Sequence, residues 1–206
     1  MTTKLLFFLT LLSLVSCSKD NATNNDPMAQ LPAETRVGAN TFGCYIKDKL
    51  LLPRDGTSLQ GGANSGCVFW GGYPENGAIY NFNEIEVRDY KSERGARFLL
   101  HIQSLAILGE GTYIIDASNG SSSIDGLFHN YINCKIFNES TNSYQYYRSY
   151  GNCGVLKITR YDYANQIVSG TFSCNVRNSV NPADEISITH GRFDFNLNTL
   201  YYKVFP

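Results

Sequence analysis

The sequence predicts an all-β protein, built as a single antiparallel β-sandwich, with a closed calycin-like β-barrel as the alternative architecture. Three observations predict this class. Apolar and polar residues alternate with a period of two in most segments beyond about residue 40. Clusters of Gly, Asn, Asp, Ser and Pro separate these segments. No long segment beyond the N-terminus keeps a helical period, and Leu105–Leu108 is the one short exception.

The first predicted element is a hairpin. Residues 42–46 alternate between apolar and polar side chains, and a turn at 47–49 leads into the apolar run 50–52. Two short β segments joined by a polar turn are typical of a hairpin at the start of a β domain.

Residues 84–88 show the cleanest alternation. Ile85 and Val87 share one face of the predicted strand, which we expect to point inward, and three charged side chains share the outward face. One face of the sheet is therefore expected to meet water, as in antiparallel sheets. Similar segments bring the total to about nine or ten strands. These lie at 98–102, 111–115, 128–136, 156–158, 172–176 and 186–188.

The alternation changes phase near the C-terminus. Ile186 and Ile188 occupy even positions, whereas Phe193 and Phe195 occupy odd positions, with Gly191 between them. One extra residue in the strand would return both pairs to the same face. We therefore predict a β-bulge at Gly191.

Residues 1–16 are predicted to be a lipoprotein signal peptide. Lys4 precedes an apolar run that is too short for a membrane span, which needs about 20 residues. The tetrad Leu-Val-Ser-Cys, which ends at Cys17, resembles the lipobox of bacterial lipoproteins, whose Cys thiol receives a diacylglyceryl group. Residues 17–30 are then the lipidated Cys and a flexible tether, and 31–206 a single β domain.

Lipidation at Cys17 predicts a location in the cell envelope, with the membrane as the first partner. We expect the outer membrane, and the tripeptide Ser18-Lys19-Asp20 partly matches the export signal of surface lipoproteins in Bacteroidota. The surface and the periplasmic side both stay open. A net charge of −1 with 17% charged residues excludes a disordered chain and gives no electrostatic footprint for nucleic acid.

Cysteine use fits an exported protein. With Cys17 assigned to lipid, five cysteines fall in the β domain, and disulfides are expected in an oxidising compartment. Spacing alone leaves several arrangements open. Cys174 lies on an apolar face and is expected to stay free. The predicted bridges are Cys44–Cys67 and Cys134–Cys153. No metal site is predicted, because no Cys-x-x-Cys motif or neighbouring His occurs.

The sequence contains no recognisable catalytic motif. His101, His129 and His190 are scattered over three predicted strands, the first two on the face opposite the core residues. Asp162 is expected to begin a hairpin turn and Asp194 to face solvent. No catalytic residue and no cofactor are therefore predicted.

Aromatic side chains give the one positive indication of a binding site. We expect two loops that carry them, one rich in Gly and one rich in Tyr. Exposed rings on loops of a rigid β scaffold stack on sugars or on partner side chains. The alternative is that these rings cover the ends of the sandwich or pair across strands. The candidates are Trp70, Tyr73, Tyr144, Tyr146, Tyr147 and Tyr150.

Several short motifs extend over most of residues 31–196. They are Gly38–Cys44, Gly111–Tyr113, Gly154–Thr159, Ile167–Phe172 with its SGTF sequence, and Ile188–Asp194 with its IT-x-GRFD sequence. On these motifs the domain resembles a family of small Bacteroidota lipoproteins that carry a domain of unknown function. The resemblance implies an all-β fold and a membrane anchor, and it brings no catalytic residues with it.

The expected function is that of a membrane-anchored envelope lipoprotein that acts as a non-enzymatic binding or structural module. Its ligand is expected to be a glycan, a peptide or another envelope protein. The first alternative is a carrier of a small apolar ligand in a barrel interior. A hydrolase with distant acids or a His beside a nucleophile is the second alternative.

Overall fold

A computed structural model describes residues 30–57, 64–72, 76–77 and 80–206. The predicted signal peptide, Cys17 and nearly all of the tether lie outside these residues. Within them no helix has the length and the apolar character that crossing a membrane requires. The strands are β1 (Thr41–Ile46), β2 (Lys49–Leu51), β3 (Cys67–Gly71), β4 (Phe82–Arg88), β5 (Arg97–Gln103), β6 (Gly111–Ile115), β7 (Tyr131–Asn138), β8 (Ser143–Arg148), β9 (Gly154–Asp162), β10 (Ile167–Asn178) and β11 (Glu185–Asn196).

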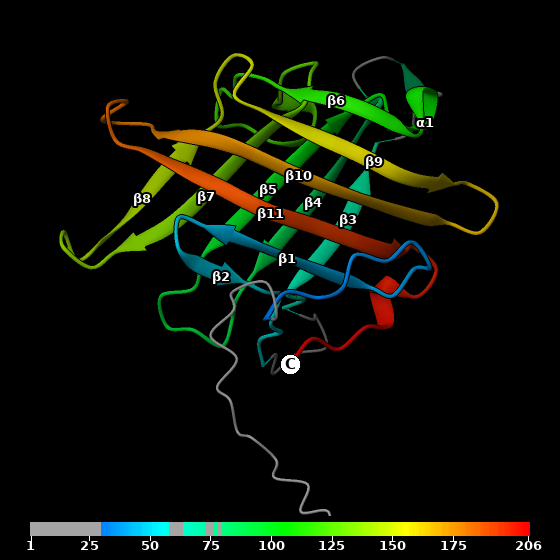
Figure 1. Cartoon of the computed structure of the whole chain (residues 1–206), viewed down its shortest axis with the longest axis horizontal. Coiled ribbons are helices and arrows are strands. Elements are labelled where there is room, and N and C mark those ends of the chain that lie inside the picture. The colour runs from blue at the N-terminus through cyan, green and yellow to red at the C-terminus, as the bar shows by residue number, and fades with distance from the viewer. Residues whose placement is uncertain (1–29, 58–63, 73–75, 78–79) are drawn as a thin grey trace, which may run out of the picture.

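The predicted all-β antiparallel fold is confirmed. One 11-stranded sheet runs in the order β2-β1-β11-β10-β8-β7-β5-β4-β3, and β9 and β6 branch from β10. The sheet curls over itself, so that the layer of β1, β9, β10 and β11 crosses in front of the layer of β3, β4, β5 and β7 (Figure 1). Strand β10 joins the two layers, because it pairs with β11 in one layer and its end pairs with β8 beside the other. The link to β8 consists of two residue pairs, Arg177 with Arg148 and Asn178 with Tyr147.

Aromatic rings from both layers meet in the interior. Phe42 of β1, Phe98 of β5 and Phe172 of β10 contact one another at ring-centroid distances of 5.3 to 5.8 Å. Phe69 of β3 reaches Phe195 of β11 at 6.2 Å. Phe42, Phe98, Phe172 and Phe195 lie on the inward faces that the period-two pattern predicts. Phe69 belongs to a strand that the pattern does not predict.

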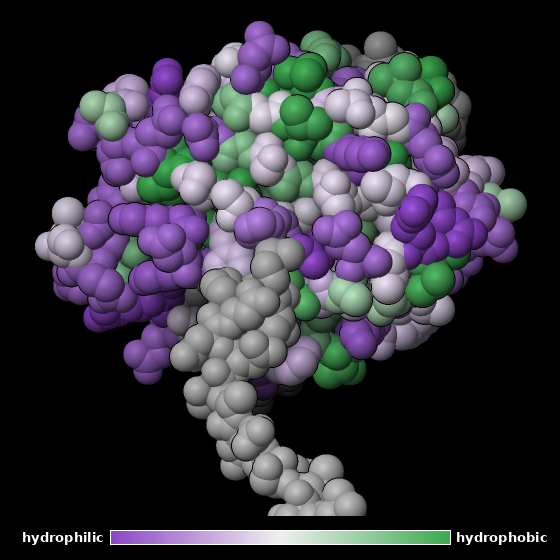
Figure 2. Space-filling model, in the orientation of Figure 1, coloured by the Kyte–Doolittle hydropathy of each residue, from purple (hydrophilic) through white to green (hydrophobic). Residues whose placement is uncertain are grey.

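The outer face of the front layer is mixed in character. Figure 2 shows apolar residues gathered over β6 and the single-turn helix α1 (Leu105–Leu108), with hydrophilic residues around the hairpin ends. Ile114 and Val155 are direct partners across β6 and β9, and both are exposed. Such a half-exposed layer is typical of antiparallel sheets.

The predicted bulge is present, with one difference in detail. Phe172 pairs with Gly191 and Cys174 pairs with Ile188, so one residue of β10 faces two residues of β11. The left-handed residue is His190, at φ 53°, and not Gly191. Gly191 is required for another reason, because a Cβ there would lie 2.4 Å from the ring of Phe172.

Replacing His190 by glycine should stabilise the protein. A left-handed conformation costs an L-residue about 1–2 kcal/mol, and the greater freedom of glycine in the unfolded chain offsets part of that gain. We expect His190→Gly to raise the free energy of unfolding by about 0.5–1 kcal/mol in urea denaturation. His190→Ala keeps the strain and loses the contact with the Tyr45 ring at 6.4 Å, so it should be destabilising. If His190→Gly and His190→Ala lowered the free energy of unfolding equally, backbone strain at His190 would not contribute to stability.

The expectation that the charged face of residues 84–88 is in water is wrong for Glu84. This residue is fully buried, because residues 116–130 fold over the outer face of β4 and β5. Its Oε1 atom accepts hydrogen bonds from the Ser123 backbone N–H at 2.7 Å and contacts His101 Nδ1 at 2.8 Å. The ring of His101 is stacked between Phe82 and Tyr131. His101 thus lies opposite the core, as predicted, but in a second buried cluster.

Asp194 is also placed differently from its prediction as a solvent-facing residue. It is only 1% exposed and accepts hydrogen bonds from the segment 35–39. This segment crosses the outer face of β11 and shields the carboxylate from water. Asp162 does begin the β9–β10 turn, as predicted, and accepts a hydrogen bond from the Asn165 backbone N–H at 3.0 Å.

Neither predicted disulfide is formed, and all five cysteines of the described residues are free thiols. Cys44 and Cys67 are on β1 and β3, strands of opposite layers that do not pair with each other. Cys44 instead lies near Cys134, and Cys67 lies near Asp55. Closeness in sequence was a poor guide here, because strand pairing decides which thiols meet. Cys174, the predicted free thiol, is free and buried, and it is discussed below with Cys153.

Candidate ligand-binding groove

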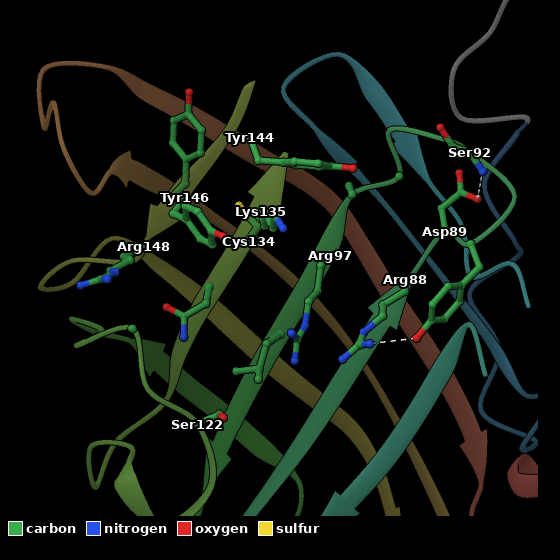
Figure 3. A pocket seen from close by; sticks show the side chains of 17 residues that line it. Arg88, Asp89, Ser92, Arg97, Ser122, Cys134, Lys135, Tyr144, Tyr146 and Arg148 are labelled. Atoms are coloured by element: carbon green, nitrogen blue, oxygen red, sulfur yellow. Dashed lines mark hydrogen bonds between the residues drawn. The ribbon is translucent and has the colours of Figure 1, made fainter. Parts of the chain in front are cut away.

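A row of three cations crosses the outer face of the back layer. Arg88 of β4 pairs with Arg97 of β5, Arg97 pairs with Lys135 of β7, and Lys135 pairs with Tyr146 of β8. Residues that are directly opposite on neighbouring strands project from the same face of a sheet. The four side chains therefore form one line across four strands, and Figure 3 shows them along an open groove.

The groove has a volume of about 540 Å³. Its walls are the turn at residues 89–96 on one side and strand β8 on the other, with Gly120 and Ser122 at one end. Arg148 holds that end in place, because its Nη1 donates a hydrogen bond to the Asn119 carbonyl at 3.0 Å. The groove is thus built on strands and closed at one end by the segment that also buries Glu84.

Glu86 offsets the electrostatic repulsion between Arg88 and Arg97. Like charges directly opposite each other destabilise a sheet. Arg88 and Arg97 each donate a hydrogen bond from Nη2 to the same Glu86 oxygen at 3.0 Å. Arg88 is further fixed by a 2.8 Å hydrogen bond from Nη1 to the Tyr90 hydroxyl. One carboxylate is shared by two guanidinium groups, so the row keeps a positive excess.

Lys135 carries the charge that is least compensated. Its Nζ atom lies 4.2 Å from the centroid of the Tyr144 ring and 5.5 Å from that of Tyr146. Among the described residues it forms no salt bridge to a carboxylate. Aromatic faces attract an ammonium group but leave its formal charge in place. The ammonium group is therefore available to form an ion pair with a bound anion.

Apart from Glu86, which the two arginines share, Asp89 is the one acid among the described residues that lines the groove, and it is already neutralised. Asp89 forms a two-pronged ion pair with Arg54, which includes a 2.7 Å hydrogen bond from Arg54 Nε. Burial alone raises the pKa of Asp89, but the hydrogen bonds from Arg54 and Ser92 outweigh it and hold the pKa below its ordinary value. The groove is thus positive in a chain whose net charge is −1.

Two of the predicted aromatic residues turn exposed rings toward this groove. Most of the Tyr-rich segment forms the strand β8 and not a loop, because it pairs with β7 across a short turn, and of its four tyrosines only Tyr150 lies beyond the end of the strand. Tyr144 and Tyr146 are 37% and 54% exposed and project on the groove side. Tyr147 points the other way, is 3% exposed and donates a hydrogen bond to Asp184 at 2.7 Å. Tyr150 lies beneath the Arg177 guanidinium at 3.7 Å.

The other predicted aromatic segment is not part of the groove. Trp70 belongs to the edge strand β3, and its ring makes an edge contact with Phe82 at 5.7 Å. Strands β4 and β5 separate it from Lys135 on β7. Tyr73 lies outside the described residues. The fold therefore does not unite the two aromatic segments in one site.

Sequence reasoning missed the cations of this row. Arg88 and Arg97 flank a turn, and Lys135 is distant from both in the chain. Each looked like an ordinary surface charge, because only the register of three strands reveals that they are neighbours. Within the described residues, no group of three His, Cys, Asp or Glu side chains is arranged to hold a metal ion.

Comparison with protein-family models, with curated proteins and with solved structures gave no significant match to this chain. The resemblance to small Bacteroidota lipoproteins therefore stays a prediction, and the groove is the basis for the functional argument.

Proposed function

We propose that this protein is a non-enzymatic binding module of the cell envelope, anchored by lipid at Cys17, that binds an acidic carbohydrate in the groove. The observation that carries the proposal is the row of Arg88, Arg97 and Lys135 that ends on the exposed rings of Tyr144 and Tyr146.

The two kinds of side chain fit the two parts of such a ligand. Guanidinium and ammonium groups form charge-assisted hydrogen bonds with carboxylates. Exposed tyrosine rings offer a flat apolar face with a polar edge, which suits the face of a sugar ring. Neighbouring strands lie about 4.8 Å apart, so the row presents cations at intervals along an extended chain.

The groove also suits a polymer better than a small enclosed ligand. It is open to solvent above the cation row, and its floor is the outer face of the sheet. The rings of Phe42, Phe98 and Phe172 occupy the space between the layers. The proposal therefore uses the outer face and not the interior that an apolar-ligand carrier needs.

Removing the Lys135 charge should weaken binding of an acidic oligosaccharide about tenfold or more, since a charge-assisted hydrogen bond contributes about 1.5–3 kcal/mol. Isothermal titration calorimetry of the full-length chain would compare Lys135→Ala with wild type, using oligogalacturonate as the acidic ligand. The control is Lys49→Ala, which removes an exposed lysine charge from β2 in the other layer. This control should leave the affinity unchanged.

Two further ligands test the chemical class. A neutral malto-oligosaccharide of equal length should bind much more weakly, and affinity for oligogalacturonate should fall as salt screens the charges. Oligoglutamate carries the same carboxylates without sugar rings, so it should bind more weakly than oligogalacturonate and be insensitive to Tyr146→Ala. Equal affinity for both acidic ligands would point to an acidic protein partner and overturn the carbohydrate proposal.

A further inference from the structure

Cys153 and Cys174 lie beside each other where β9 begins. Cys174 of β10 pairs with Gly154, and the Asn175 backbone N–H donates to the Cys153 carbonyl at 3.0 Å. A Cβ on Gly154 would lie 2.2 Å from the Cβ of Cys174. Glycine at this position therefore lets the β9 backbone approach Cys174 more closely than any other residue allows.

An irregular strand start turns the Cys153 side chain toward Cys174. In two regular strands these positions project from opposite faces. Cys153 precedes β9, however, and follows Asn152, whose φ is 53°. Its side chain packs against the core, and its thiol donates to the Ile115 carbonyl with a sulfur–oxygen distance of 3.6 Å. The two thiols are close enough to share a hydrogen bond, which is the first cause of the pKa shift of each.

The two thiols differ in access and in acidity. Cys153 is partly exposed, whereas Cys174 is buried. The hydrogen bond from Cys174 lowers the pKa of Cys153 below that of an ordinary thiol, although burial opposes the effect. The same hydrogen bond is the main cause that raises the pKa of Cys174, and burial raises it further. Burial raises the pKa of Cys134 to about 12 and also raises that of Cys44. Cys153 is thus the most reactive of these thiols.

We propose that Cys153 and Cys174 form a two-cysteine redox site, which closes to a disulfide by exchange with a small-molecule disulfide. Cys153 is the attacking thiol and Cys174 the resolving thiol.

The reaction takes place in two balanced steps. The Cys153 thiolate attacks one sulfur of the small disulfide, whose S–S bond breaks, and a mixed disulfide forms while one small thiolate leaves. Cys174 then gives its proton to solvent and attacks the Cys153 sulfur. The protein disulfide forms and the second small thiolate leaves. The protein loses two electrons and two protons, and the small disulfide becomes two thiols.

Peptide mapping would test the site in the folded full-length chain. Oxidised glutathione is added, remaining thiols are alkylated under denaturing conditions, and the chain is cleaved with trypsin. Cys153 and Cys174 fall on separate tryptic peptides, 149–157 and 161–177. We expect these two peptides to be linked, with Cys44, Cys67 and Cys134 still alkylated. Separate alkylated peptides 149–157 and 161–177, or a link to another cysteine, would overturn the proposal.

Single substitutions separate the two roles. Cys174→Ser should trap glutathione on Cys153, whereas Cys153→Ser should leave Cys174 unmodified in the folded chain. Cys67→Ser removes a buried thiol that is not part of the pair, so the linked peptide should still form in this control. If glutathione were found on Cys174 in the Cys153→Ser variant, Cys153 would not be the attacking thiol and the assignment of the two roles would be wrong. Peptide mapping of the wild-type chain tests the Cys153–Cys174 link without any substitution. Its result therefore holds even if one of the variants fails to fold.

Discussion

Asp194→Ala is expected to lower the free energy of unfolding by about 3–5 kcal/mol, because one buried donor and four partly buried donors lose the buried acceptor that they share. The Oδ2 atom accepts hydrogen bonds from the Thr35 hydroxyl at 2.6 Å and from the backbone N–H groups of Val37 and Ala39, each at 3.0 Å. The Oδ1 atom accepts from the Gly38 N–H at 2.8 Å and the Ser169 hydroxyl at 2.7 Å. Urea denaturation of the variant and the wild type measures the loss.

Ser169→Ala is the matched control for this prediction. It removes one of the five hydrogen bonds to Asp194 and should cost about 1 kcal/mol. Loss of the carboxylate should also release the segment 35–39 from β11, so trypsin should cleave after Arg36 faster in Asp194→Ala than in Ser169→Ala. Equal stability and equal cleavage in the two variants would show that the carboxylate does not anchor this segment.

The same carboxylate should make stability depend on pH in the acid range. Burial alone raises the pKa of Asp194, but the hydrogen bonds from Thr35, Ala39 and Ser169 outweigh it, so the pKa lies below its ordinary value. The contribution is therefore complete above the unfolded value of about 3.9 and is lost as pH falls through the lower folded value. Wild type should lose more stability than Asp194→Asn over this window.

Local pattern was sufficient for the strands whose faces alternate. The hairpin of β1 and β2, the strands β4 and β5, and the bulge in β11 follow from the period-two placement of apolar residues. Sequence reasoning places the Tyr-rich segment 144–150 in a loop, although tyrosine favours strands. Its pairing with β7 shows that β propensity was the better guide there.

What sequence reasoning missed depends on contacts between distant segments. Asp194 and Glu84 are charged residues on outward faces, and each was expected in water. The first is covered by residues 35–39 and the second by residues 116–130, neither of which is adjacent in the chain. The cation row and the Cys153–Cys174 pair likewise arise from strand register. No periodicity within one strand contains that information.

Glu84→Ala is expected to lower the free energy of unfolding by about 2–4 kcal/mol, because it leaves a buried imidazole and a partly buried backbone N–H without their acceptor. His101 and the Ser123 N–H both use the Oε1 atom, and His101 is only 1% exposed. Residues 116–130 should then detach from β4 and β5. Since Ser122 lines the groove, calorimetry should also show weaker binding of oligogalacturonate.

Tyr131→Phe is the control that separates this effect from a simple change in the buried cluster. The Tyr131 hydroxyl is buried without a hydrogen-bond partner among the described residues. Removing an unsatisfied buried hydroxyl should leave stability unchanged or raise it by about 0.5–1 kcal/mol, with no change in affinity. Glu84→Gln keeps an oxygen that can accept from the Ser123 N–H, so its free energy of unfolding should lie between those of Glu84→Ala and Tyr131→Phe. If Glu84→Ala were as mild as Tyr131→Phe, the carboxylate would not be what holds residues 116–130 against the sheet, and the closed end of the groove would need another anchor.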